Sequence, residues 1–471
     1  MRSYIVRFKE TRQPEAPAVA ITKPTARQIR TRTGCAQCKR RRVKCDEQQP
    51  ACQRCRARGE NCSGPVVVPR WQTIVLAQDS SDSGLVQYWM TAVCGPMPLE
   101  LHKPELLPDA VLPLLDGSPA LLHCLRGVAI AHRGFFSAEA LPASLRETSH
   151  ALAALRTELA PINGDPCHLH RTLLAALSLS ILSVWLDPSS QDSSSLLHLR
   201  GASSVLHLLL RVREEEASTL TNFMVGFYVY IDMIHSYAVP AARPLPLSDI
   251  LASRLASSAA YVHPITGIAT SLCLVVARVG RYLRSVVDLR RRDPGIERTL
   301  HCALRDWQPP AAATRQPPNH RHGRIADAYR ILGQIMLQQA RRHVAIVDTP
   351  PSSAPVENDD DMPPPLSTLV PQALRIIAAD DAATSSYADA ATSGVYTRGI
   401  VLLAVGPEVS PGAGRVVIAD AFARLHKLTR VNHFLLAARF VRDACWPLRD
   451  RGVEFTWLDL LVRAGLTCVL I

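Results

Sequence analysis

Six cysteines in one short stretch constrain this chain more than any other feature of its sequence. They follow the spacing C-x2-C-x6-C twice, and the second copy is displaced by 17 residues. The six are Cys35, Cys38, Cys45, Cys52, Cys55 and Cys62. Between the first and the last of them, the only aliphatic side chain larger than alanine or proline is Val43, so the stretch has no hydrophobic core. A segment this small needs disulfides or a metal to hold its fold.

A bound metal, rather than disulfides, is expected to hold this fold together. Residues 1–10 contain no apolar run that would serve as a secretory signal, so the sequence does not point to an oxidising compartment. Structural zinc takes four ligands and favours thiolates, and residues 1–101 contain no histidine. Six thiolates satisfy two tetrahedral ions only if two of them bridge. The repeat makes the bridging pair equivalent positions, and the residues leave three choices open: Cys35/Cys52, Cys38/Cys55 or Cys45/Cys62.

The stretch 34–64 resembles the zinc binuclear cluster of fungal transcription factors. The resemblance is carried by Cys-Lys-Arg-Arg-Arg-Val-Lys-Cys-Asp-Glu at 38–47 and by the later Cys-Ser-Gly. It implies two Zn²⁺ ions, with Cys35 and Cys52 as the bridging thiolates. It pairs the remaining ligands as Cys38 with Cys45 on one ion, and Cys55 with Cys62 on the other.

Basic residues follow the second cysteine of the first half-repeat. Five of the six residues from 39 to 44 are cationic: Lys39, Arg40, Arg41, Arg42 and Lys44. In the second half, glycine and glutamate interrupt the corresponding run. Clustered cations neutralise DNA phosphates, and a forked donor reads guanine, so the first half, as a short helix after its C-x2-C, is the expected groove-entering element.

The family resemblance assigns roles within this basic run. It implies that Arg41 and Arg42 read a CGG-type triplet in the major groove of double-stranded DNA, while Lys39, Arg40 and Lys44 contact phosphates. The same run would serve as a nuclear localisation signal. The expected protein is therefore a nuclear transcription factor of RNA polymerase II genes that contacts the transcription machinery.

Charge divides the chain into a basic start and a neutral remainder. Residues 1–64 hold 16 Lys and Arg against 5 Asp and Glu, whereas the rest holds 37 against 36. We expect a basic flexible arm at 1–33, the cluster domain at 34–64, a linker at 65–84 and a regulatory domain at 85–471. The linker carries prolines and no apolar heptad, so any homodimer is expected to form through the regulatory domain.

The regulatory domain is predicted to be all α. It is rich in leucine and alanine at helical spacing, for example Leu145, Leu152, Leu155 and Leu159 on one face. It resembles the second type of fungal-specific transcription factor domain, through Leu197-His-Leu-Arg-Gly-Ala, Phe227-Tyr-Val-Tyr-Ile-Asp and the terminal Cys445-Trp. Proline-rich tracts at 307–323 and 349–365 predict disordered insertions.

Competing functions find less support in the sequence. No phosphate loop, G-x-S-x-G or H-E-x-x-H occurs, so the protein is not expected to be an enzyme. A zinc-dependent protein–protein adaptor or a metabolite-binding regulator remains an alternative, although an adaptor gives the basic run no purpose. The uncharged stretch 172–186 is too short to span a membrane and predicts a buried helix. Cys167-His-Leu-His and the histidines at 320 and 322 lack zinc-like partners and are expected to be incidental.

Overall fold

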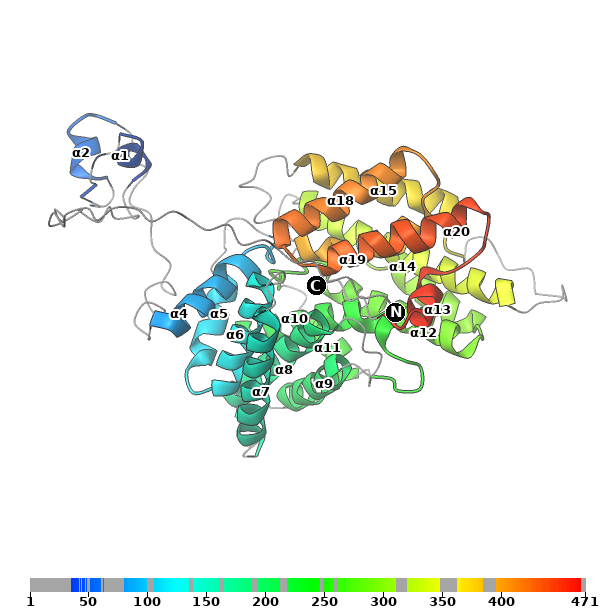
Figure 1. The fold of residues 1–471 in the computed structure, drawn as a ribbon, viewed down its shortest axis with the longest axis horizontal. Coiled ribbons are helices and arrows are strands. Elements are labelled where there is room, and N and C mark those ends of the chain that lie inside the picture. Colours follow the sequence, from blue (N-terminus) through cyan, green and yellow to red (C-terminus); the bar gives the residue numbers. More distant parts are fainter. Residues whose placement is uncertain are drawn as a thin grey trace, which may run out of the picture. The chain divides into compact units, whose positions relative to one another are not determined.

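The computed structural model divides into two compact units, residues 1–69 and 70–471. It describes residues 35–41, 43, 45–46, 48, 51–60, 62, 80–99, 106–134, 139–160, 165–187, 194–211, 218–245, 249–257, 261–310, 320–347, 362–383 and 395–466. Within these ranges the secondary structure is helical and contains no strand (Figure 1). The predicted fold class, a cysteine-rich domain with two short helices followed by a large all-α domain, is confirmed.

The small unit contains α1 (Ala36–Arg40) and α2 (Gln53–Arg56). Each helix begins directly after the first cysteine of a C-x2-C, because that cysteine's sulfur accepts the N–H of the second cysteine, at 3.4 Å in both halves. The expectation that each helix follows its C-x2-C was therefore wrong. The first helix ends at Arg40, so it holds only the first two residues of the basic run.

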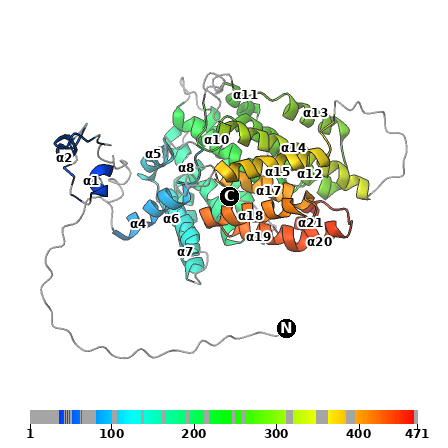
Figure 2. The same cartoon turned by 90° about the horizontal axis from the view of Figure 1, so that it is seen from above.

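The first part of the large unit is a set of packed helices. These are α4 (Ser80–Tyr88), η1 (Trp89–Val93), α5 (Leu106–Leu115), α6 (Pro119–Arg133), α7 (Ala140–Leu159), α8 (Pro166–Leu186), α9 (Ser194–Arg211) and α10 (Thr219–His235). Helix α4 starts inside the predicted linker, whose residues 65–79 lie outside the described part of the chain. In Figures 1 and 2, α4–α8 gather on one side of this unit and α10 lies between them and the later helices.

The second part of the large unit continues the helical packing. It comprises η2 (Ser236–Ala238), α11 (Asp249–Ser257), α12 (Thr270–Leu289), α13 (Pro294–Arg305), α14 (His320–Val347), α15 (Leu366–Ala383), η5 (Val395–Arg398), α17 (Gly399–Val405), η6 (Gly406–Glu408), α18 (Ala413–Thr429), α19 (His433–Arg439), η7 (Phe440–Cys445), α20 (Trp446–Asp450) and α21 (Trp457–Arg463). Helix α12 packs against both α10 and α14. It also packs against η2, and Gly280 permits that approach, because a Cβ there would lie 2.0 Å from Ser236 Oγ.

Helix α8 runs through the core of the large unit. Among the described residues it is the helix long and apolar enough to cross a membrane, yet 83% of its most apolar window of 18 residues is buried inside the fold. Asp165 caps its start by accepting the N–H groups of Cys167 and His168, and Pro166 takes the first helical position. The prediction that residues 172–186 form a buried helix is confirmed.

Two details of the large unit differ from the sequence-based expectation. The buried face of α7 is formed by Ser144, Glu147, Ala151 and Leu155, whereas Leu145 and Leu159 are exposed. The four predicted leucines share a face, but of these only Leu155 is fully buried. Helix α14 begins at His320, within the predicted insertion 307–323. Residues 311–319 and 349–361, like the basic arm 1–33, lie outside the described residues.

Of the motifs that resemble the regulatory domain, Phe227–Asp232 is a packing element, whereas Leu197 of the Leu197–Ala202 motif is exposed. Phe227–Asp232 is buried within α10, and Asp232 accepts hydrogen bonds from Arg281 of α12 at 2.6 Å. The indole of Trp457 is buried and donates to Gln339 of α14 at 2.9 Å. Both contacts join segments that are far apart in the sequence.

Candidate metal centre and nucleic-acid interface

The six clustered cysteines come together in the small unit, and none of them is joined in a disulfide. Five are buried and Cys62 is half-buried. They form two groups of four whose sulfur atoms lie within 4.8 Å of one another. The first group is Cys35, Cys38, Cys45 and Cys52, and the second is Cys35, Cys52, Cys55 and Cys62. The two groups therefore share Cys35 and Cys52.

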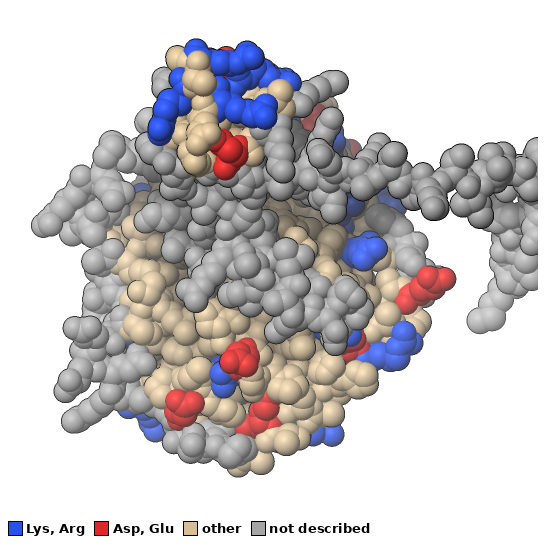
Figure 3. Space-filling view, turned by 90° about the vertical axis from the view of Figure 1, so that its left-hand side faces the viewer, with Lys and Arg blue, Asp and Glu red and all other residues tan. Residues whose placement is uncertain are grey.

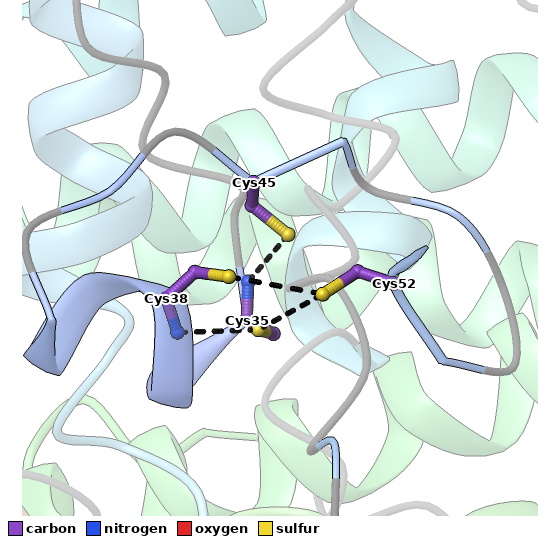
Figure 4. A group of neighbouring side chains, drawn as sticks. All are labelled: Cys35, Cys38, Cys45 and Cys52. Carbon is purple, nitrogen blue, oxygen red and sulfur yellow. Dashed lines mark hydrogen bonds between the residues drawn. The ribbon is translucent and has the colours of Figure 1, made fainter. Parts of the chain in front are cut away.

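The sulfur–sulfur distances fit tetrahedral zinc. Four sulfurs at about 2.3 Å from one ion are separated from one another by about 3.8 Å. The Sγ atom of Cys35 lies 3.8 Å from that of Cys52 and 3.7 Å from that of Cys55. The Sγ atoms of Cys38 and Cys52 are 3.7 Å apart. Figure 4 shows the first group of four converging on one another from three separate segments of the chain.

Backbone groups prepare these sulfurs to act as thiolates. The N–H of Cys38 donates to Cys35 Sγ, the N–H of Cys55 donates to Cys52 Sγ, and the N–H of Cys35 donates to Cys45 Sγ at 3.5 Å. Burial, together with hydrogen bonds to neighbouring thiols, raises the pKa of the Cys35 thiol to about 12. A dication reverses that effect, because it stabilises the deprotonated ligand. The donor set therefore fits two zinc ions that share two thiolates.

Two family domains match the chain. The Fungal specific transcription factor domain matches residues 84–471. The Fungal Zn(2)-Cys(6) binuclear cluster domain matches residues 33–68. The chain belongs to this family of fungal zinc-cluster transcription regulators. Zinc binding, DNA binding and transcription regulation follow as the general properties of the family.

Curated relatives match over the cluster region. The Aspercryptin biosynthesis cluster-specific transcription regulator atnN of Emericella nidulans is 51% identical over 41 residues, 9% of this chain and 7% of its own. White-opaque regulator 2 of Candida albicans is 39% identical over 59 residues, 12% and 13% of the two chains. Transcriptional regulatory protein moc3 of Schizosaccharomyces pombe is 52% identical over 42 residues, 9% and 8%. The matched region thus spans about a tenth of these relatives, and no solved structure matches the chain.

The predicted DNA-contacting residues are only partly described. Arg40 is exposed at the end of α1, and Arg41 is half-buried in the turn that follows. Lys39 lies in α1, but its side chain is outside the described part of the structure, as are residues Arg42 and Lys44. Figure 3 shows Lys and Arg side chains crowded on the visible face of the small unit. On the large unit, the Lys and Arg side chains are scattered among acidic ones.

An acidic partner of the basic run was missed by sequence reasoning. Glu60, treated as an interruption of the second half's positive charge, pairs with Arg41 at 2.9 Å. The two residues are 19 positions apart, so no local periodicity could indicate the pair. Only the equivalence of the two half-repeats, which face each other in the folded cluster, could have suggested it.

Other histidine-containing groups have local explanations. His170 is buried and its Nε2 lies 3.0 Å from Thr221 Oγ1, while Cys167 is exposed. His123, Glu147 and His150 come within metal-binding distance. The Glu147 carboxylate, however, already lies 2.8 Å from His123 Nδ1 and 2.9 Å from the guanidinium of Arg126. That carboxylate is accounted for as part of a hydrogen-bonded ion-pair network in the described residues.

Proposed function

We propose that this protein is a nuclear, sequence-specific transcription factor of RNA polymerase II genes that reads a CGG-type triplet. Its six clustered cysteines bind two Zn²⁺ ions, with Cys35 and Cys52 bridging. The observation that carries the metal assignment is that two groups of four neighbouring sulfurs share this one pair. The two members of each alternative bridging pair, Cys38/Cys55 and Cys45/Cys62, belong to different groups. Neither pair is therefore shared.

The DNA interface is proposed on the first half-repeat. Its basic run presents five cations within six residues, and such density supports phosphate neutralisation and guanine reading together. Arg42 is assigned to a base, and Lys39, Arg40 and Lys44 are assigned to phosphates. Arg41 was also predicted to read a base, but its described contacts are all within the cluster domain.

The helical body is proposed to be regulatory. Residues 65–471 are close to electroneutral, so they add little to the attraction for DNA. They contain exposed leucines such as Leu141 and Leu145 on α7, through which a homodimer or the transcription machinery would be contacted. Names of the curated relatives describe transcription regulators, which supports the same role for this chain.

The test combines metal analysis with DNA binding by the full-length protein. We expect two zinc ions per chain and retardation of a duplex carrying a CGG triplet, but not of one with that triplet scrambled. Cys167→Ser is the matched control, because Cys167 is exposed and lies outside the cluster. Zinc retention without any preference for the triplet would favour the adaptor alternative, and one zinc per chain would refute the bridging arrangement.

A further inference from the structure

The guanidinium nitrogens of Arg41 donate hydrogen bonds to partners within the cluster domain. Its Nε donates to the carbonyl of Gln37 at 3.3 Å, its NH1 donates to Glu60 Oε1 at 2.9 Å, and its NH2 donates to Cys55 Sγ at 3.5 Å. Each guanidinium nitrogen therefore has a partner within the small unit. A residue that reads guanine must instead offer two parallel donors to the base edge.

These three partners belong to both half-repeats. Gln37 lies in α1, Cys55 in α2, and Glu60 follows α2. Gly59 adopts a left-handed backbone, φ 64°, and the N–H of Glu60 then donates to the carbonyl of Cys55 at 3.0 Å. This turn sets the carboxylate beside Arg41. The guanidinium consequently connects the end of α1 to the second half-repeat, across the metal centre.

The charge of the metal centre makes a cation at this position favourable. Two zinc ions and six thiolates carry a formal charge of about −2. Groups that hydrogen-bond to metal ligands orient them and adjust their basicity. The Arg41 guanidinium contacts the sulfur of Cys55, which is a ligand of one ion only in the proposed arrangement. It therefore offsets thiolate charge while Glu60 holds it in place.

We propose that Arg41 is a positioning residue that clasps the two half-repeats through Glu60 and Cys55, and that base reading falls to Arg42. This inference rests on the proposed function, because it assigns the specificity of the same site. Glu60 acquires a role that its acidic character in a basic domain did not suggest. It holds the guanidinium of Arg41 in place, and its role is not to repel DNA phosphates.

The experiment compares Glu60→Gln, Arg41→Gln and the double variant in the full-length protein. Arg40→Gln is the matched control, because Arg40 is adjacent, exposed and of the same charge. Two quantities are measured: the rate of zinc transfer to a chromogenic chelator, and the ratio of dissociation constants for scrambled and CGG duplexes. The first reports the clasp and the second reports base reading.

We expect Glu60→Gln to speed zinc release about twofold to fivefold, as loss of an exposed ion pair implies. Arg41→Gln should speed it about tenfold, because the contact to Cys55 is lost as well. The double variant should match Arg41→Gln, since both changes break one clasp. Arg40→Gln should leave zinc release unchanged, and Glu60→Gln and Arg41→Gln should each leave the ratio of dissociation constants within about threefold of wild type.

Two results would overturn the inference. One is an Arg41→Gln variant that releases zinc at the wild-type rate but loses the preference for CGG, which would make Arg41 a base reader. The other is additive acceleration in the double variant, which would mean that the two residues act separately. If the wild-type protein shows no triplet preference, the proposed function fails, while the zinc-release measurements still decide whether the clasp exists.

Discussion

Replacing a shared thiolate should cost more zinc affinity than replacing an unshared one, and the structure gives a matched pair for this comparison. Cys52 belongs to both groups of four sulfurs, whereas Cys38 belongs to one. Both side chains are fully buried. Serine keeps the size of the side chain but removes the thiolate, so Cys52→Ser affects both ions and Cys38→Ser affects one.

The magnitude follows from the number of zinc–sulfur bonds. A structural zinc ion stabilises its folded site by on the order of 10 kcal/mol through four ligands. One zinc–sulfur bond therefore corresponds to about a quarter of that, or roughly 70-fold in affinity. Cys38→Ser loses one such bond and Cys52→Ser loses two. The affinity of each affected ion should thus fall by about 70-fold, and the product of the two zinc affinities should fall by about 70-fold more in Cys52→Ser than in Cys38→Ser.

The assay is competition for zinc between the full-length protein and a chelator of known affinity, with metal content counted at each step. Cys38→Ser should retain one ion tightly and Cys52→Ser should weaken both. The control Cys167→Ser should behave as wild type. If Cys52→Ser and Cys38→Ser lose zinc equally, with one ion retained in each, Cys52 does not bridge and the arrangement is refuted.

Three further predictions concern specificity and stability. Arg42→Ala should reduce discrimination for the CGG triplet by about tenfold to a hundredfold, and equal effects on both duplexes would contradict this. Lys39→Ala should instead weaken binding to all sequences alike and lower the slope of log affinity against log salt concentration by about one. Burial lowers the pKa of His235 and of His263 to about 4. The unfolded chain therefore takes up protons first as pH falls below about 6.5, and the free energy of unfolding should drop between pH 6.5 and 4. Urea titrations followed by helical circular dichroism should give a lower midpoint at pH 5 than at pH 7.5, and equal midpoints would refute it. Glu408→Ala should destabilise the helical body by about 3–5 kcal/mol in the same assay, because it leaves Arg342 and Arg449 without the buried carboxylate that both contact at 2.6 Å; a loss below about 1 kcal/mol would contradict this.

The spacing of the cysteines was sufficient to predict a metal-stapled domain, because the thiolates are the only groups there able to hold a fold. Composition and helical periodicity were likewise sufficient to predict an all-α body and the burial of α8. In both cases the determinants are local, because ligand type, apolar spacing and helix propensity depend on residues that are close together in the sequence.

Contacts between distant segments were not predictable in the same way. The sequence indicated a basic first helix, but α1 ends at Arg40, and Arg41 pairs with Glu60 from the other half-repeat. On α7 the leucine spacing indicated only part of the buried face: Leu155 is buried, but Glu147 also faces α6, as the partner of His123 and Arg126. A break after α18 falls at Arg430, a non-glycine residue with φ 59°, which turn chemistry alone does not indicate.

Selection of bound sequences from a pool of random duplexes by the full-length, zinc-loaded protein tests the central claim most directly. The claim is that a two-zinc cluster presents the basic first half-repeat to guanine-containing base pairs. We expect enrichment of a CGG-type triplet, and loss of that enrichment in Cys52→Ser but not in Cys167→Ser. Recovery of no common triplet by the wild-type protein, or an unchanged triplet with Cys52→Ser, would contradict it.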